Sequence, residues 1–175
     1  SDTSQNNEKL TFGTFSFGTM VTLNGKGNMG IGISAPMAGL HVVKNSGVIA
    51  SGTFANPESL GVTGAGTRMF WFPKKAVFRT GRLLADAIVP GDETTFWDED
   101  SLGNYSFASG LNVKASGAYS NAFGNFADAT GSNSFAAGKF STASGNGSVA
   151  MGLETDASGN YAMAVNNYNV ARGHS

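Results

Sequence analysis

The sequence predicts an all-β protein in which a parallel β-roll (solenoid) of about 14-residue coils follows an irregular β-rich segment. Glycine accounts for 25 of the 175 residues and charged residues for 13%, a composition unlike that of a helical protein. From Gly103 to Gly173 a glycine recurs every seven residues, with Asn166 as the one replacement. Alanine fills the sixth place of every seven-residue unit, from Ala108 to Ala171. A repeat this strict indicates stacked, near-identical coils.

The seven-residue unit favours a short strand over a coiled coil. A coiled-coil heptad needs large apolar residues at two positions, and each glycine destabilises a helix by about 1 kcal/mol. A strand that rises about 3.3 Å per residue and is closed by a glycine turn fits seven residues. Asn166 supports this interpretation, because asparagine tolerates a positive φ better than other non-glycine residues.

Residues 1–67 are expected to form a β-rich fibre or connector segment. Apolar residues separated by Thr, Ser and Gly predict strands over residues 10–23, followed by a turn at Asn24–Gly27. Residues 27–43, GNMGIGISAPMAGLHVV, resemble the GNVGIGT element of bacterial surface fibres and phage tail fibres. That resemblance implies a fibrous, trimeric parent protein.

Residues 68–102 are expected to form an aromatic and charged cap or insert before the roll. One interpretation is structural: opposite charges pair and the aromatic residues close the open end of the roll, since a solenoid end exposes unpaired edges. The other is a glycan site, in which Trp71 or Trp97 stacks on a sugar and polar groups hydrogen-bond to it. The candidate ligand-binding residues are Trp71, Arg79, Trp97, Asp98 and Glu99.

Residues 103–175 are expected to form the roll, with two seven-residue units in each coil. Places five and seven are apolar in one unit, as at Val149 and Met151, and polar in the next, as at Asp156 and Ser158. Places four and six are small in nearly every unit and are predicted to face inward. Each coil therefore has one strand with a polar outer face and one with an apolar outer face.

The apolar outer face predicts self-association, because soluble monomers rarely expose a contiguous patch of this kind. A rotationally symmetric assembly closes the patch on itself; three chains is the natural number, and the pattern also allows two. Asn121 interrupts the face and is either exposed or an axial site that pairs with its copies or holds an ion or water. The predicted interface residues are Phe107, Phe123, Phe135, Val149, Met151, Met163 and Val165.

The segments NSFAAGKFSTASG, GSVAMGLETDASG and GNYAMAV resemble the head repeats of trimeric autotransporter adhesins of the YadA type. The resemblance implies a left-handed parallel β-roll, three chains side by side, and a place on a bacterial surface. The 175 residues show neither the coiled-coil stalk nor the membrane-anchor strands of that family. We therefore expect outer-membrane anchoring through parts outside this chain.

The composition argues against several other functions. A net charge of −1 provides no basic field for nucleic acid or anionic lipid, and no stretch of about twenty apolar residues predicts membrane insertion. There is no cysteine, and His41 and His174 are the only histidines, so one chain is not expected to build a zinc site. No G-x-S-x-G motif is present. We expect no catalytic residues, metal or cofactor.

Three functions remain open from the sequence. The first is the ligand-binding head of a trimeric bacterial surface fibre that adheres to host or prey glycans or to matrix or cell-surface proteins. The second is a phage tail-fibre or spike segment that binds or cleaves a surface polysaccharide. The third is a purely structural fibre spacer.

Overall fold

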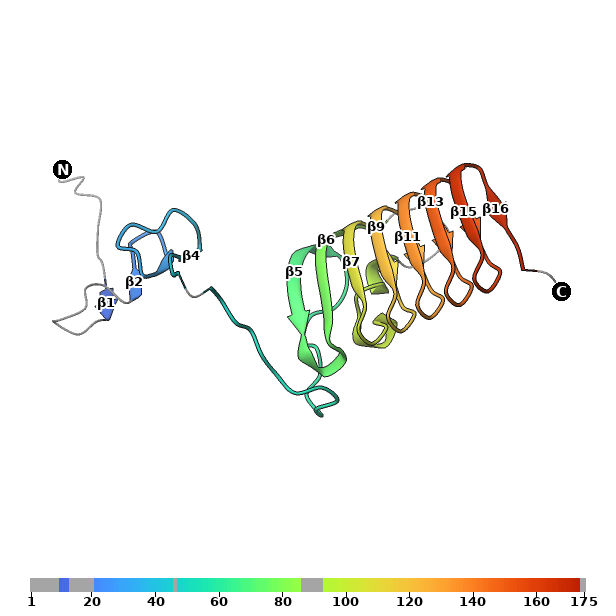
Figure 1. Ribbon diagram of the computed structural model, residues 1–175. Coiled ribbons are helices and arrows are strands. Elements are labelled where there is room, and N and C mark those ends of the chain that lie inside the picture. The colour runs from blue at the N-terminus through green and yellow to red at the C-terminus, as the bar shows by residue number, and fades with distance from the viewer. Residues whose placement is uncertain (1–9, 13–20, 46, 86–92, 174–175) are drawn as a thin grey trace. The chain divides into compact units, whose positions relative to one another are not determined.

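The computed structural model describes residues 10–12, 21–45, 47–85 and 93–173, and these residues form two compact units, Ser1–Ala50 and Ser51–Ser175 (Figure 1). The described residues are strands and turns with three short 3-10 helices and no α-helix. The predicted all-β class is confirmed.

The first unit contains a four-stranded sheet in chain order. Strands β1 (Leu10–Phe12) and β2 (Val21–Leu23) are antiparallel, β3 (Met29–Ile31) pairs antiparallel with β2, and β4 (Leu40–Val42) pairs parallel with β3. The Asn24 Oδ1 accepts the backbone N–H groups of Lys26 and Asn28, both at 3.0 Å. This side-chain turn explains why the chain reverses at the predicted position, between β2 and β3. Residues 13–20, within the predicted strand region, lie outside the described residues.

The second unit begins with a non-repetitive part. Strands β5 (Gly66–Phe72) and β6 (Val77–Leu83) form an antiparallel hairpin around the 3-10 helix η1 (Pro73–Lys75). Two further 3-10 helices, η2 (Glu93–Thr95) and η3 (Glu99–Ser101), lead into the roll. The preceding segment is fastened to this part, because the Phe54 ring stacks on Tyr105 at 4.9 Å and the Ala55 N–H donates to the Lys74 carbonyl at 2.9 Å.

The roll consists of five coils, each with a long and a short strand. In chain order these are β7 (Phe107–Leu111), β8 (Lys114–Ala115), β9 (Asn121–Asn125), β10 (Asp128–Ala129), β11 (Phe135–Lys139), β12 (Thr142–Ala143), β13 (Val149–Leu153), β14 (Asp156–Ala157), β15 (Met163–Asn167) and β16 (Val170–Ala171). The long strands stack in parallel, and β6 and β5 extend them into a seven-stranded sheet of order β15-β13-β11-β9-β7-β6-β5. The short strands form a five-stranded parallel sheet. Partners lie 14 residues apart, as between Phe135 and Val149, which confirms the predicted coil length.

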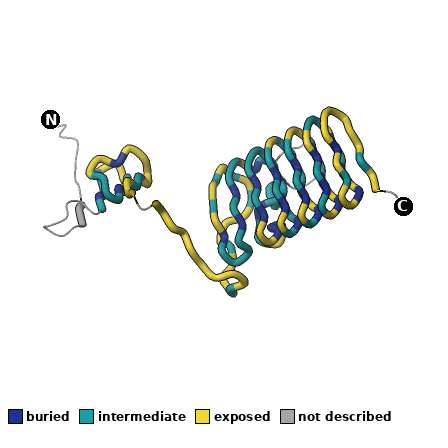
Figure 2. Tube along the Cα trace, in the orientation of Figure 1, coloured by how far each residue is buried: buried dark blue, intermediate teal, exposed yellow. Residues whose placement is uncertain are grey.

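Small side chains fill the narrow space between the two sheets. The sixth-place alanines from Ala108 to Ala164 are fully buried, and the fourth-place residues Ser120, Ser134 and Ser148 lie beside them, as predicted (Figure 2). Between the two sheets there is no room for a large side chain, which explains why these places hold only Ser, Ala, Thr or Val from Ser106 to Ala164. Asn169, at the fourth place of the last coil, is exposed.

The glycines have a different role from the predicted one in half of the units. Gly124 has a φ of +120°, in agreement with the interpretation of Asn166, whose φ is +88°. Gly131, in contrast, has no positive φ; a Cβ there would overlap the carbonyl oxygen of Gly145 in the next coil. The predicted glycine turn is therefore corrected: many glycines are required because neighbouring backbones approach too closely for a side chain.

The turns themselves use the third place of each unit, which the sequence analysis missed. These residues adopt left-handed φ values of +48° to +65°, although most of them are not glycine: Tyr105, Asn112, Tyr119, Phe126, Asn133, Phe140, Gly147, Glu154, Tyr161 and Tyr168. Stacking along the edge of the roll accompanies this conformation, since the rings of Tyr105 and Tyr119 lie 4.9 Å apart and those of Phe126 and Phe140 lie 5.1 Å apart.

Candidate functional site

Two rows of in-register side chains lie on the outer face of the seven-stranded sheet, and we call this surface the apolar face. The first row contains Phe107, Asn121, Phe135, Val149 and Met163. The second row contains Ser109, Phe123, Ala137, Met151 and Val165. All seven predicted interface residues thus lie on one face. Within one chain they are half-buried or exposed, and Met163 is 65% exposed.

The two rows are complementary in size around Asn121. Phe123 lies diagonally between Phe107 and Phe135, and its ring centroid is 5.3 Å from the first and 5.7 Å from the second. Its row neighbours, Ser109 and Ala137, are small. The first row has no aromatic ring at Asn121, and the Phe123 ring of the second row contacts Phe107 and Phe135 on either side of it. The aromatic surface is therefore continuous past Asn121. The Asn121 Nδ2 donates to the Tyr119 carbonyl at 3.4 Å.

Trp97 lies at the end of the roll, and its burial corrects the ligand-binding prediction for this residue. The side chain is fully buried, its Nε1–H donates to the Val113 carbonyl at 3.0 Å, and the Phe70 ring contacts it edge-on at 6.2 Å. No ring face is accessible to a sugar. Trp97 instead closes the roll beside β8, which is the structural alternative proposed from the sequence.

Arg79, another predicted ligand-binding residue, is also buried. It pairs with Ala108 in the sheet, so its side chain takes the inward direction that alanine takes in the coils. Its guanidinium donates to the Ser106 carbonyl at 3.0 Å, the Ser106 Oγ at 2.7 Å and the Ala115 carbonyl at 2.9 Å. Burial lowers the pKa of Arg79 to about 10, so it remains a cation at neutral pH. Arg79 and Trp97 together satisfy carbonyls at the free edge of the five-stranded sheet.

Asp98 and Glu99 bind the chain's own backbone. The Asp98 Oδ1 accepts the Gly64 N–H at 3.0 Å, and the Glu99 Oε2 accepts the Leu60 N–H at 2.8 Å. Glu99 also forms an ion pair with Lys74 at 2.7 Å, and the hydrogen bond from Lys74 is the largest cause of its lowered pKa. The opposite charges predicted to pair therefore do so here, and these carboxylates hold the segment before the hairpin.

Trp71 is the one predicted ligand-binding side chain with an exposed ring, at 42% exposure. It lies on β5 and pairs in register with Phe78 on β6. The five predicted ligand-binding residues do not form a single open site, since Arg79 and Trp97 are buried at the end of the roll. Nearby, residues of the 51–61 and 72–74 segments line a shallow hollow of about 310 Å³ with Asn56, Glu58 and Lys74 among its polar groups.

Glu93 and Asp128 are functional-site candidates that sequence reasoning missed. Glu93 is buried, and neither its Oε1 nor the Asp128 Oδ1 has a hydrogen-bond partner in the described part of the chain. Burial raises the pKa of Asp128 to about 6; Glu93 raises it further, and Lys114 opposes this. The Lys114 ammonium lies 4.9 Å from the centre of the Phe96 ring. Asp128 occupies the fifth place of its seven-residue unit, and the polar residues at this place predict only that its side chain points outward. The repeat pattern does not predict that residues 93–97 cover it.

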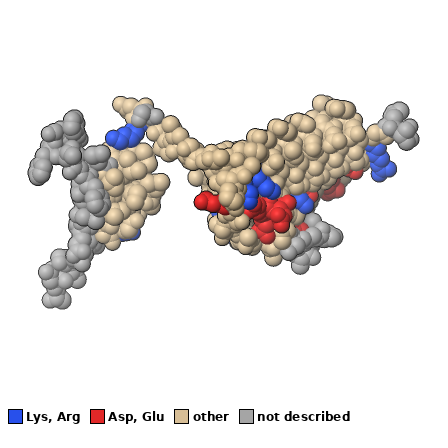
Figure 3. All heavy atoms as spheres, turned by 90° about the horizontal axis from the view of Figure 1, so that it is seen from below, with Lys and Arg blue, Asp and Glu red and all other residues tan. Residues whose placement is uncertain are grey.

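Among the described residues, charged side chains gather on one part of the roll unit and leave most of the visible roll surface uncharged (Figure 3). No three side chains that commonly bind metal converge within the described ranges, which include His41 but not His174. Those ranges also contain no helix long and apolar enough to cross a membrane.

The coils match a known family model. Residues 115–141, 129–155 and 143–165 match the YadA head domain repeat. The roll is a YadA-like head. The matched residues contain most of the apolar face, and the structure extends the same coil to β7 before them and to β16 after them. The YadA head family is a family of trimeric surface adhesins and not of enzymes. No curated protein matches the chain.

Proposed function

We propose that the chain assembles through its apolar face into a homotrimer and forms the ligand-binding head of a bacterial cell-surface fibre. The strongest support is the composition of the two rows of the apolar face. Ser109 and Asn121 are the two polar side chains among their ten residues. The YadA head repeats support the same proposal independently.

The direction of the rows favours a rotational assembly. Both rows run along the stacking direction of the coils, so a symmetry axis parallel to them brings every residue of a row against its own copies. Rows of Phe, Val and Met then pack on themselves without a register mismatch. Asn121 meets two further Asn121 side chains near the axis, where the amides pair or hold a water or ion.

The proposed homotrimer carries three identical ligand-binding sites on one rigid body, and weak binding at each site is sufficient for adhesion. When ligands are dense on a glycan layer or a protein matrix, the second and third contacts form at a high effective concentration, and avidity exceeds the single-site affinity. The outer surface of the five-stranded sheet faces away from the proposed interface, and the part of it that residues 93–97 do not cover is available for such contacts. The hollow beside Lys74 is a second candidate surface.

Binding to immobilised glycan and matrix-protein arrays tests the adhesion proposal. The wild-type chain is compared with Val149→Asp, which is designed to be monomeric. We expect the wild type to bind one ligand class strongly and Val149→Asp to bind it weakly at the same chain concentration. A trimer that binds no ligand on either array contradicts the proposal and leaves a spacer role. Turnover of a bound polysaccharide contradicts the adhesin and supports a phage-type spike.

A further inference from the structure

The hairpin β5–β6 continues both rows of the apolar face beyond the repeats. Phe78 pairs with Phe107, and Trp71 pairs with Phe78, which extends the first row by two strands. Thr80 pairs with Ser109, and Met69 pairs with Thr80, which extends the second row in the same way. The repeat pattern starts at Gly103, so its periodicity does not predict that these residues share a surface with the roll.

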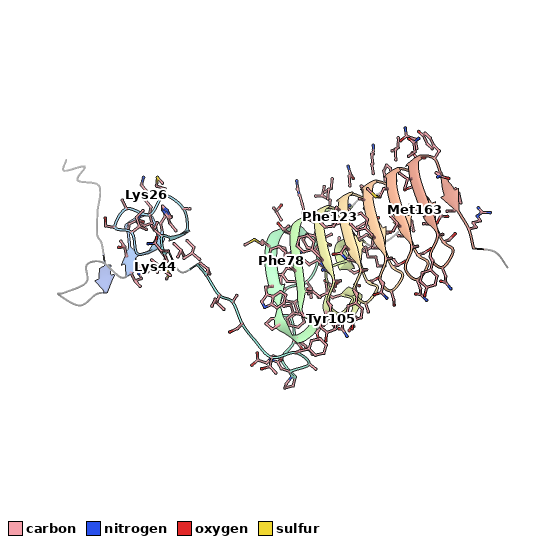
Figure 4. The ribbon with its side chains drawn as sticks, in the orientation of Figure 1. Lys26, Lys44, Phe78, Tyr105, Phe123 and Met163 are labelled. Carbon is pink, nitrogen blue, oxygen red and sulfur yellow. The ribbon has the colours of Figure 1, made fainter. Side chains whose placement is uncertain are left out.

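The direction of the side chains agrees with the register. The Phe78 ring stacks on Phe107 with 5.4 Å between centroids and 20° between planes, so the two rings point to the same side. Phe70 and Phe72 alternate with Trp71 and point to the other side, where Phe70 contacts Trp97 and Phe72 is buried. Trp71 therefore lies on the same face of the sheet as Phe78, its partner in the register. Figure 4 labels Phe78, Phe123 and Met163 along this sheet.

The hairpin leaves large apolar side chains uncovered at this end of the face. Trp71 is 42% exposed and Met69 is 72% exposed, although the interior of the cap already contains Trp97, Phe70 and Phe72. The hairpin also lengthens each row from five strands to seven, from about 19 Å to about 29 Å at 4.8 Å per strand. Neither exposed side chain is required to close the end of the roll.

We infer that the hairpin is part of the self-association surface, and that Trp71 and Met69 pack against their own copies in the partner subunits. This inference rests on the proposed homotrimer. The partner is a second copy of this chain because β5, β6 and β7 belong to one hydrogen-bonded sheet. An axis that brings Phe107 and Phe135 against their copies then brings Trp71 against its copies as well. The Trp71 ring is consequently unavailable for stacking on a glycan.

Collisional quenching of tryptophan fluorescence by acrylamide tests this inference, because the chain has only two tryptophans and Trp97 is fully buried within one chain. The same sample is first measured by light scattering. The Trp71→Phe variant retains Trp97 as its one tryptophan. If the protein is a trimer, we expect the fluorescence of the wild type to be quenched as weakly as that of this variant. Met163→Asp is designed to break the assembly at the far end of the row, and Ser144→Asp is a control on the other sheet. We expect acrylamide to quench Trp71 severalfold more strongly in Met163→Asp than in Ser144→Asp.

The outcomes separate this inference from the proposed function. A trimer in which the wild type is quenched severalfold more than Trp71→Phe overturns the inference alone, and it restores Trp71 as a candidate ligand-stacking residue. A wild-type monomer overturns both. Should Met163→Asp fail to fold, a photo-reactive phenylalanine analogue at position 71 is expected to cross-link the subunits, whereas the same analogue at position 144 is not. A trimer without the cross-link at position 71 contradicts the inference.

Discussion

The coils and the segment before them are stabilised in different ways. The coils repeat one small-residue interior and one backbone ladder, so each unit contributes in the same manner. The segment 66–102 uses single large contacts instead: the buried guanidinium of Arg79, the indole of Trp97 and the carboxylate of Glu99. The repeating coils are therefore encoded by backbone spacing, whereas closure of the end of the roll depends on individual polar side chains that have no periodic pattern in the sequence.

The largest expected effect comes from breaking the backbone spacing of the roll. Gly131→Ala adds a Cβ that overlaps the carbonyl of Gly145 in the next coil, and a backbone atom cannot yield as a side chain can. We expect loss of cooperative folding of the roll, which thermal unfolding followed by circular dichroism measures. The adjacent Ser132→Ala is the matched control and is expected to change the melting temperature little. A Gly131→Ala roll with wild-type stability contradicts the spacing argument.

The next largest effect concerns the apolar face. Val149→Asp places one carboxylate per chain in the proposed interface, where each buried and unpaired charge is strongly unfavourable. We expect dissociation to monomers with the β-sheet circular dichroism retained. Ser144→Asp introduces the same charge on the exposed side of the other sheet and should leave the assembly intact. Equal masses for the two variants are the result that contradicts this prediction.

Removing the buried cation tests the cap. Arg79→Met keeps a long apolar side chain but removes the guanidinium hydrogen bonds to the Ser106 and Ala115 carbonyls, which then keep only their backbone N–H donors, from Phe78 and Gly103. We expect a loss of about 2 kcal/mol in the free energy of unfolding, since hydrogen bonds to a charged group contribute about 1.5–3 kcal/mol each and removal of the buried cation offsets part of the loss. Chemical denaturation measures it. The exposed Arg82→Gln is the control, expected within about 0.5 kcal/mol of the wild type.

The sequence predicts the repeating coils well and the non-repetitive segment before them poorly. The spacing of glycine and alanine was sufficient for the coil length, the small interior and the residues on the apolar face. The third-place turns were missed, because Tyr105 and Phe126 are not residue types that favour a positive φ. The role of Glu99 could not be predicted, since its acceptor contact joins it to Leu60, 39 residues away. Arg79 and Trp97 looked like ligand groups because their residue types are common at surfaces and binding sites, and only the sheet register turns them inward.

The smallest expected effect is a dependence of the free energy of unfolding on pH, caused by the carboxyl group of Asp128. Burial raises the pKa of Asp128 to about 6, so the folded state binds its proton more tightly than the unfolded state. Stability is therefore highest below the unfolded pKa near 4, falls as the pH rises through about 6, and stays lower above it, with Lys114 offsetting part of the loss. We expect Asp128→Asn to stabilise the protein by about 1–2 kcal/mol at pH 7.5 and to remove this dependence. A series of denaturation curves from pH 4 to pH 8 measures both, and a variant whose stability falls with pH as steeply as that of the wild type contradicts the assignment to Asp128.

The molar mass of the purified chain, measured by light scattering behind a sizing column, tests the central claim that the apolar face is an interface. The account predicts a particle of three times 18.0 kDa at micromolar concentration. A monodisperse particle of 18.0 kDa under the same conditions would show that the two apolar rows remain in contact with water, and it would contradict the account.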